Sequence, residues 1–307
     1  MKQYYSNGKL LLTAEYMVLD GAKALALPTK FGQDLLVEKI SLPKLIWKSF
    51  DENNNTWFEA EFDLNGFEII KPDNDLLATK TLQKILKEAF KLSSKENRED
   101  FLPTENGIKI NTNLTFPRNW GLGTSSTLIN NIAKWLKVSS FELLKNSFGG
   151  SGYDIACAEN NTPILFQLNN EKPIIEPIEF NPSFKEQLYF VHLNKKQNSR
   201  EGIKKYRNFS GSIHEISDEI SVLTELFLTA KDIKTFESAM LQHEGIISNV
   251  IKEKPIQKAL FSNYFGQTKS LGAWGGDFIL ATGNKKTPAY FKSKGFHTVI
   301  AYKDMIL

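Results

Sequence analysis

The chain has 307 residues, of which 38 are lysine or arginine and 35 are aspartate or glutamate, so its formal net charge is only +3. This near balance argues against nucleic acid as the main partner, and no apolar run approaches the roughly 18 residues that a membrane span needs. The single cysteine, Cys157, excludes an intrachain disulfide and a cysteine-rich metal site, and its apolar neighbours predict a buried thiol.

The first part of the chain is predicted to form an antiparallel sheet. Short runs rich in branched and aromatic residues are typical of strands, and the polar cluster at residues 51–55 (DENNN) is typical of a hairpin turn. The expected strands cover residues 9–12, 16–19, 33–40, 45–50 and 57–64.

Helices dominate the next part. Asn74 or Asp75 can cap a helix that runs to about residue 92, because its apolar residues recur at helical spacing. A polar break at residues 93–100 is expected to end it. The elements expected after this break are a strand at 107–114, a helix from about 124 to 136 and a helix at 153–159.

The proline-spaced segment 173–182 is the best candidate for a domain junction. We therefore expect one domain over residues 1–180 and a second over residues 181–307, with an α+β fold. The first residues lack the basic, apolar and cleavage segments of a signal peptide, which predicts a cytoplasmic protein. The remaining expected elements are strands at 163–168, 188–193, 278–281 and 297–302 and helices at 213–230 and 233–251.

Three glycine-rich stretches next to apolar runs predict phosphate binding: residues 117–127 (PRNWGLGTSST), 149–156 (GGSGYDIA) and 270–280 (SLGAWGGDFIL). Glycine lets the backbone approach an oxyanion and turn its N–H groups inward, and a helix that begins there adds the positive end of its dipole. One such loop is weak evidence. Three in one chain indicate phosphoryl transfer from a nucleotide.

The first of these stretches is the best phosphate-binding candidate. Gly121 and Gly123 free the backbone, and the hydroxyls of Thr124, Ser125 and Ser126 stand where a helix begins. Such a loop offers N–H donors together with a hydroxyl for a phosphate-bound magnesium ion. Its spacing is that of neither a Walker A loop nor a dinucleotide-binding GxGxxG motif. A helix cap that binds no ligand is the alternative interpretation.

Asp154 follows the second stretch at the start of the expected helix. An aspartate in this place is most often a helix cap. A carboxylate held beside a lysine stays ionised at neutral pH and can orient or deprotonate an acceptor hydroxyl, and Lys9 is the matching cation. The four histidines, His192, His214, His243 and His297, lack zinc-ligand spacing and are interpreted as structural.

These residues resemble the GHMP family of small-molecule kinases. Its first motif, Pro-Gly-Lys followed by Gly-Glu-His/Tyr, is similar to residues 7–9 (NGK) and 14–16 (AEY). Its second, Pro-x-x-x-Gly-Leu-Gly-Ser-Ser-Ala, is similar to residues 117–126, with Thr124 and Ser126 as departures. Its third, Gly-Ala-Gly-Gly-Gly, is similar to residues 272–276 (GAWGG). The resemblance spans nearly the whole chain.

The resemblance implies a two-domain GHMP-kinase fold with the active site between the domains, and the use of ATP and Mg²⁺. It assigns catalysis to Asp154 and Lys9. The residues that it assigns to the nucleotide are Pro117, Gly121, Leu122, Gly123, Thr124, Ser125 and Ser126. Those that it assigns to the substrate are Glu15, Tyr16, Gly152, Gly272, Ala273, Trp274 and Gly275. Magnesium would be held by Ser125 and Glu142.

Two positions depart from the family pattern. Trp274 puts an indole where the family has glycine in the third motif, where it either stacks on the nucleotide or closes the substrate pocket. The magnesium-binding glutamate of mevalonate kinases falls on Leu143, and Glu142 is its neighbour on a helix.

Three details favour phosphomevalonate as the acceptor: Tyr16, the GSGYDIA segment and Asp277 directly after Gly276. Mevalonate is the alternative acceptor. A ligand-binding protein that has lost phosphotransfer through Trp274 and the missing glutamate is the alternative of another class. The partner is thus expected to be a small-molecule phosphate acceptor, with no nucleic acid and no membrane, and the protein a monomer or homodimer.

Overall fold

The computed structural model describes residues 1–94, 97–98, 106–197 and 199–307, and the chain divides into two compact units that are not contiguous in sequence. Unit 1 comprises residues 1–8, 31–118 and 122–159, and unit 2 comprises residues 9–30, 119–121 and 160–307. The boundary expected near residue 180 lies within unit 2 and stays a prediction. The polar break expected at 93–100 falls partly outside the described residues.

The sheet of unit 1 has the strand order β5-β4-β3-β6-β2, with β1 paired to β2. β3 and β6 pair in parallel, with Leu45 opposite Ile108, whereas the pairs β2–β6, β3–β4 and β4–β5 are antiparallel. These strands are β1 (Lys2–Leu11), β2 (Ala24–Ile40), β3 (Leu45–Phe50), β4 (Thr56–Phe62), β5 (Ile69–Lys71) and β6 (Gly107–Leu114).

The strands of unit 1 are rich in branched and aromatic residues, which favour extended backbone. Buried and half-buried residues alternate along β3, so that its side chains face the core at every second position. The turn between β3 and β4 is closed by Asp51, whose Oδ1 accepts the N–H groups of Asn53 at 2.9 Å and Asn55 at 2.8 Å. The predicted hairpin turn is therefore confirmed.

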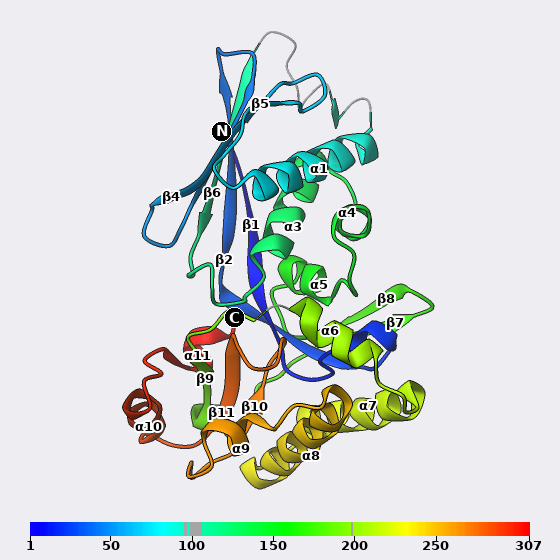
Figure 1. Cartoon of the computed structure of the whole chain (residues 1–307), viewed down its shortest axis with the longest axis vertical. Coiled ribbons are helices and arrows are strands. Elements are labelled where there is room, and N and C mark those ends of the chain that lie inside the picture. The colour runs from blue at the N-terminus through cyan, green and yellow to red at the C-terminus, as the bar shows by residue number, and fades with distance from the viewer. Residues whose placement is uncertain (95–96, 99–105, 198) are drawn as a thin grey trace. The chain divides into compact units, whose positions relative to one another are not determined.

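Helices pack on one face of this sheet (Figure 1). The first is capped by Asp75, whose Oδ1 accepts the Ala78 N–H at 2.9 Å, as the sequence predicts. The core between sheet and helices includes Trp47 and Phe62 from strands and Leu86 and Ile129 from helices. The helices of unit 1 are α1 (Leu76–Leu92), α3 (Thr124–Leu136), α4 (Ser140–Ser147) and α5 (Tyr153–Glu159). Cys157 in α5 is buried, as expected.

Unit 2 contains a hairpin, which pairs with the first residues of β2, and a separate antiparallel sheet in the order β10-β11-β9-β12. The hairpin strands are β7 (Ile164–Asn169) and β8 (Lys172–Pro177). The sheet strands are β9 (Leu188–His192), β10 (Thr268–Ser270), β11 (Phe278–Thr282) and β12 (Val299–Ala301). Strand β8 covers the first half of the segment that the sequence indicates as a domain junction.

Two long helices of unit 2, α7 (Ile213–Thr229) and α8 (Ile233–Ile251), pack against each other, and α8 also packs against β10. Ser212 and Asp232 cap them through side-chain oxygens that accept backbone N–H groups. The shorter helices are η1 (Met17–Asp20), η2 (Lys185–Gln187), α6 (Ser199–Arg207), α9 (Ile256–Leu260), α10 (Thr287–Ser293) and α11 (Tyr302–Met305).

The structure corrects one element. Residues 16–19, expected as a strand, lie in the 3₁₀-helix η1 and the turn before it. Tyr16 has φ of 64°, outside the strand region, and the Leu19 N–H donates to the Tyr16 carbonyl oxygen at 3.0 Å, which is the i to i+3 bond of a 3₁₀-helix. The expected strand at 9–12 is also longer, since β1 begins at Lys2.

Within the part of the chain that the structure describes, no helix combines the length and the apolar character needed to cross a membrane.

Candidate active site

The first glycine loop ends in unit 1 at the start of helix α3. Gly123 stands at the N-cap with φ of 96°, a left-handed conformation that favours glycine. Ser126 Oγ and Thr127 Oγ1 both donate to the Gly123 carbonyl oxygen, at 2.9 and 3.0 Å. Ser125, by contrast, is exposed. Because the first N–H groups of a helix have no partner within it, this end of α3 presents N–H groups and the Ser125 hydroxyl to an anion.

The other residues of the predicted nucleotide loop have different environments. Leu122 is completely buried and Pro117 is half-buried, so they support the loop rather than offer polar groups. Thr124 is half-buried at the first position of α3. Arg118 is exposed, and its guanidinium carbon lies 3.7 Å from the centre of the Trp57 ring in a cation–π contact.

Asp154 lies in the first turn of α5, also in unit 1, and its Oδ1 accepts the Ile155 N–H at 3.1 Å. Helix α5 packs against α3, so the second glycine stretch and the first loop belong to neighbouring helices. Gly152 just before it has φ of 88°, and a Cβ there would lie 3.0 Å from ring carbons of Phe141. The left-handed backbone of Gly152 strains any residue with a side chain, and the added Cβ would in addition be in tight contact with the Phe141 ring.

The candidate magnesium glutamate lies on α4. Glu142 is exposed in the first turn of that helix, whereas Leu143 is completely buried in the core of unit 1. The one-residue offset thus places the carboxylate on the solvent side of α4. Magnesium binding by Glu142 stays a prediction.

Lys9 in unit 2 is half-buried, and its Nζ donates to the Gly121 carbonyl oxygen at 3.0 Å. The structure therefore brings the first motif and the first glycine loop together. Asp154 belongs to the other unit, so the pairing of Lys9 with Asp154 stays a prediction.

Asp277, in the third glycine stretch, lies beside Gly121, which also binds Lys9. Its carboxylate packs against Gly121: a Cβ added to Gly121 would lie 2.4 Å from Asp277 Cγ. Asp277 Oδ1 accepts the Gln197 N–H at 3.2 Å. Burial raises the pKa of Asp277, while the charge of Lys9 acts in the opposite direction. Lys9 of the first motif, Gly121 of the first glycine stretch and Asp277 of the third thus lie together within unit 2.

His192, at the end of β9, contacts residues 119 and 120 of the first glycine stretch. Its Nδ1 accepts the Asn194 N–H at 3.3 Å, so Nε2 carries the proton and donates to the Asn119 carbonyl oxygen at 3.1 Å. Its ring also contacts the rings of Trp120 and Phe278. Burial lowers the pKa of His192, which keeps the imidazole neutral. A structural role, as the sequence indicates, agrees with these contacts.

Tyr16 connects the first motif to the third glycine stretch. The Trp274 N–H donates to Tyr16 Oη at 3.2 Å, and the Tyr16 ring stacks on Tyr206 with a centroid distance of 6.2 Å. A Cβ on Gly202 would lie 2.2 Å from Tyr16 Oη, so α6 approaches this hydroxyl closely. The substrate-assigned Tyr16 and Trp274 are therefore neighbours.

The third stretch itself combines open and buried positions. Gly272 and Gly275 have φ of 60° and 83°, and Gly275 is exposed. Ala273 and Trp274 are 8 % and 5 % exposed, so the Trp274 indole is packed inside unit 2. Among the described residues, the indole Nε1 has no hydrogen-bond partner.

Glu15 is assigned to the substrate by the family resemblance, but its side chain is not at the surface. It is completely buried, and its Oε1 bonds to Lys269 Nζ. His243 and Glu244 are buried beside it. The sequence analysis did not single out Lys269 or Glu244. Lys269 stands in a polar run, residues 267–270 (QTKS), so no local pattern in the sequence marks it as buried.

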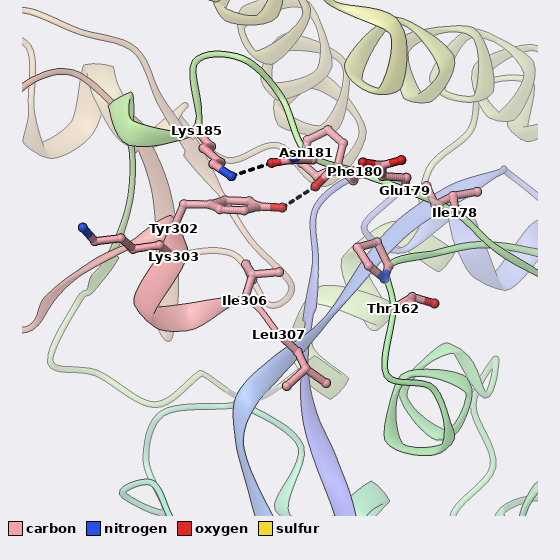
Figure 2. Close-up of a pocket in the computed structure, with 11 residues that line it drawn as sticks. Thr162, Ile178, Glu179, Phe180, Asn181, Lys185, Tyr302, Lys303, Ile306 and Leu307 are labelled. Carbon is pink, nitrogen blue, oxygen red and sulfur yellow. Dashed lines mark hydrogen bonds between the residues drawn. The ribbon is translucent and has the colours of Figure 1, made fainter.

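A pocket of about 340 Å³ lies elsewhere in unit 2 (Figure 2). Tyr302 Oη points to the Phe180 carbonyl oxygen and donates to it at 2.7 Å, and Lys185 Nζ donates to Asn181 Oδ1 at 2.7 Å. The lining residues are Thr162, Pro163, Ile178, Glu179, Phe180, Asn181, Lys185, Tyr302, Lys303, Ile306 and Leu307. None of the predicted site residues belongs to this lining.

Neither a protein-family model nor a curated protein sequence matches the chain. Solved structures do match it. The Streptococcus pneumoniae phosphomevalonate kinase in complex with phosphomevalonate and AMPPNP is similar with a TM-score of 0.70 and 14 % identity, over 98 % of this chain and 100 % of that chain. The Methanococcus jannaschii mevalonate kinase is similar with a TM-score of 0.69 and 18 % identity, over 95 % and 94 %.

A sugar kinase is also similar. The Lactococcus lactis galactokinase complexed with galactose has a TM-score of 0.62 and 14 % identity, over 96 % of this chain and 88 % of that chain. These likenesses extend over almost the whole chain, and the fold that the sequence motifs imply is thereby confirmed.

Proposed function

We propose, from the premise that this chain has the fold of the GHMP kinases, that it transfers the γ-phosphoryl group of ATP to a small-molecule acceptor, with phosphomevalonate as the best candidate. The observation that carries the proposal is the start of α3, where Gly123 with positive φ is followed by N–H groups and an exposed Ser125 hydroxyl. Mevalonate is the alternative acceptor.

The residues present fit a nucleotide with a magnesium ion. Gly121 and Gly123 both adopt the left-handed backbone that lets N–H groups turn toward an oxyanion. Mg²⁺ usually keeps several waters and takes one or two protein oxygens besides the substrate phosphates. Ser125 can supply one such oxygen and Glu142 a second. Bound in this way, the ion would neutralise charge on the transferred phosphoryl group.

In this mechanism the chain contributes mainly positioning and charge. The α3 N-terminus holds the phosphates, and Lys9, fixed by its bond to the Gly121 carbonyl oxygen, stabilises negative charge on the transferred group. Asp154 orients the acceptor in line with the bond that breaks. A hydroxyl acceptor such as mevalonate also gives its proton to Asp154, whereas a phosphate acceptor is largely ionised already.

The acceptor side is assigned to the region around Tyr16 and the third glycine stretch. The hydrogen bond between the Trp274 N–H and Tyr16 Oη fixes these two segments to each other. Trp274 is packed inside unit 2 rather than exposed, which supports a structural effect of the indole on the acceptor pocket rather than stacking on a nucleotide.

The proposal is tested by measuring ATP consumption in the presence of magnesium with four acceptors in parallel: mevalonate, phosphomevalonate, homoserine and galactose. The mass of each product is measured as well. Turnover on phosphomevalonate supports the leading assignment, and turnover on mevalonate moves it to the alternative. ATP binding without turnover on any of these acceptors would contradict the kinase assignment for these substrates and favour a ligand-binding protein on the same fold.

Asp154→Asn tests the catalytic assignment. We expect turnover to fall by about 10²-fold or more, as for other groups that assist proton transfer and orientation, while the dissociation constant of ATP measured by calorimetry changes little. Asp75→Asn is the matched control, because Asp75 also opens a helix of unit 1 and asparagine caps helices equally well. Equal turnover in Asp154→Asn and Asp75→Asn would remove the proposed role of Asp154.

A further inference from the structure

Four ionisable side chains are buried together in unit 2. Glu15, His243 and Lys269 have no exposed surface and Glu244 is 1 % exposed. They come from three places in the chain: the turn after β1, helix α8 and strand β10. Burying charged groups is costly unless they are paired and hydrogen-bonded, so this cluster calls for an explanation other than core packing.

The cluster fixes the strand that leads into the third glycine stretch. Lys269 Nζ bonds to Glu15 Oε1 and donates to the Ser270 carbonyl oxygen at 2.9 Å. Glu244 Oε2 accepts the Ser270 N–H at 3.0 Å, and its Oε1 accepts the Ser270 hydroxyl at 3.0 Å and the Ile256 N–H at 3.1 Å. Ser270, the first residue of the third glycine stretch, is thus held through its N–H, its carbonyl and its side chain.

The same cluster fixes the turn that carries Tyr16. His243 Nε2 accepts the Ala14 N–H at 2.9 Å. Ala14 and Tyr16 both have φ of 64°, a conformation that is strained for a residue with a side chain. Such strain persists only when surrounding contacts enforce it. His243 on one side of the turn, the Lys269 bond to Glu15 at its centre and the Trp274 N–H on Tyr16 Oη supply those contacts.

The electrostatic state of the cluster agrees with this role. Burial, together with the charge of Lys269, holds the pKa of His243 well below its usual range, so the ring is neutral and its Nε2 accepts a hydrogen bond. Glu15 Oε2 lies 3.4 Å from this nitrogen and, among the described residues, has no hydrogen-bond partner. The charged groups that face Glu15 are Lys269 from β10 and Glu244 from α8.

We infer that His243 and Lys269 are positioning residues, which lock the strained turn at residues 14–16 and the third glycine stretch into one arrangement and thereby set the affinity of the acceptor. The kinetic part of this inference rests on the proposed function. The structural part does not, since the bonds of Ala14 and Ser270 exist in the fold whatever reaction the protein catalyses.

The test compares His243→Leu with His243→Gln. Glutamine offers an acceptor oxygen that can replace Nε2, whereas leucine has similar bulk and no acceptor, which leaves the Ala14 N–H buried and unpaired. We expect native-state hydrogen exchange at the Ala14 amide to be at least tenfold faster in His243→Leu than in wild type, and close to wild type in His243→Gln. The KM of the acceptor should rise at least tenfold in His243→Leu, with the KM of ATP within about twofold.

Equal exchange rates at Ala14 in the two variants would overturn the structural inference. A KM for ATP that rises as much as the KM for the acceptor would overturn the assignment to the acceptor side. If wild-type protein turns over no acceptor, the kinase proposal fails, and the exchange measurement still decides whether His243 holds the turn.

A second pair of variants addresses Lys269 and covers the case in which His243→Leu does not fold. At pH 8, above the pKa of about 7 that Glu15 has beside Lys269, Lys269→Met removes the cation that faces the buried Glu15 carboxylate. Glu15 must then take up a proton or remain an unpaired buried charge, and the variant should unfold at lower denaturant concentration than wild type. Adding Glu15→Gln removes the unpaired charge and should recover stability, while the acceptor KM stays at least tenfold above wild type because the turn remains untethered. A double variant with wild-type acceptor KM would contradict the inference.

Discussion

Replacing Gly121 by alanine is expected to disturb both the first glycine loop and Lys9, the lysine proposed to act in catalysis. Gly121 has φ of 68°, and its Cβ would lie 2.4 Å from Cγ and 2.5 Å from Oδ2 of Asp277. Two heavy atoms cannot approach so closely, so the Asp277 carboxylate must leave its place. It would then lose the Gln197 N–H, and the Gly121 carbonyl oxygen that binds Lys9 would shift.

The cost has two parts. An L-residue in the left-handed region costs about 1–2 kcal/mol relative to glycine. Losing a hydrogen bond to a charged group costs about 1.5–3 kcal/mol. We therefore expect Gly121→Ala to lower the free energy of unfolding by roughly 2.5–5 kcal/mol. Turnover should fall as well, because Lys9 loses its fixed position.

Urea unfolding at constant pH measures this loss, and Gly295→Ala is the control. Gly295 also belongs to unit 2 and has φ of 87°, but an added Cβ there meets no atom within 4 Å. It should cost only the backbone part, about 1–2 kcal/mol, and leave turnover unchanged. Asp277→Gly in the Gly121→Ala background should recover part of the stability by removing the overlap. Equal destabilisation by Gly121→Ala and Gly295→Ala would refute the argument that Asp277 requires a glycine at position 121.

Two further predictions concern the buried glutamate and the hydroxyls of the first loop. Burial raises the pKa of Glu15 from 4.5 to about 7, so the folded chain holds a proton that the unfolded chain releases. Its contribution to stability is full below pH 4.5 and falls by at most roughly 3 kcal/mol as the pH rises through 7. In Glu15→Gln, the free energy of unfolding from urea titrations should depend less on pH between 4.5 and 7 than it does in wild type. The same pH dependence in both proteins would contradict this prediction. Ser125→Ala should weaken magnesium-dependent ATP binding in calorimetry and change stability by less than about 0.5 kcal/mol. Ser126→Ala, which removes the bond to the Gly123 carbonyl oxygen, should instead lower stability by about 1 kcal/mol. Weaker ATP binding in Ser126→Ala and lower stability in Ser125→Ala would contradict this assignment of the two serines.

The sequence alone determined those helices and strands that depend on neighbouring residues, such as a helix cap or a run of branched residues. Helix α1 begins after Asp75 because a cap and an apolar period of 3.6 residues are both readable in the chain. Strands β3 and β6 have the bounds that their apolar and branched residues predict. The order of the three glycine motifs also indicated the fold, which the similar solved structures confirm.

Tertiary structure decided what depends on contacts between distant residues. The turn at residues 14–16 has positive φ at Ala14 and Tyr16, and neither residue type favours it. It exists because His243, Lys269 and Trp274 hold it from segments more than 200 positions away. The strand predicted at residues 16–19 is wrong for this reason. The burial of Glu15 beside Lys269 is not readable from the sequence either, and the assignment of Glu15 to the substrate stays a prediction. Burial and pairing of charges arise from packing, which local sequence patterns do not encode.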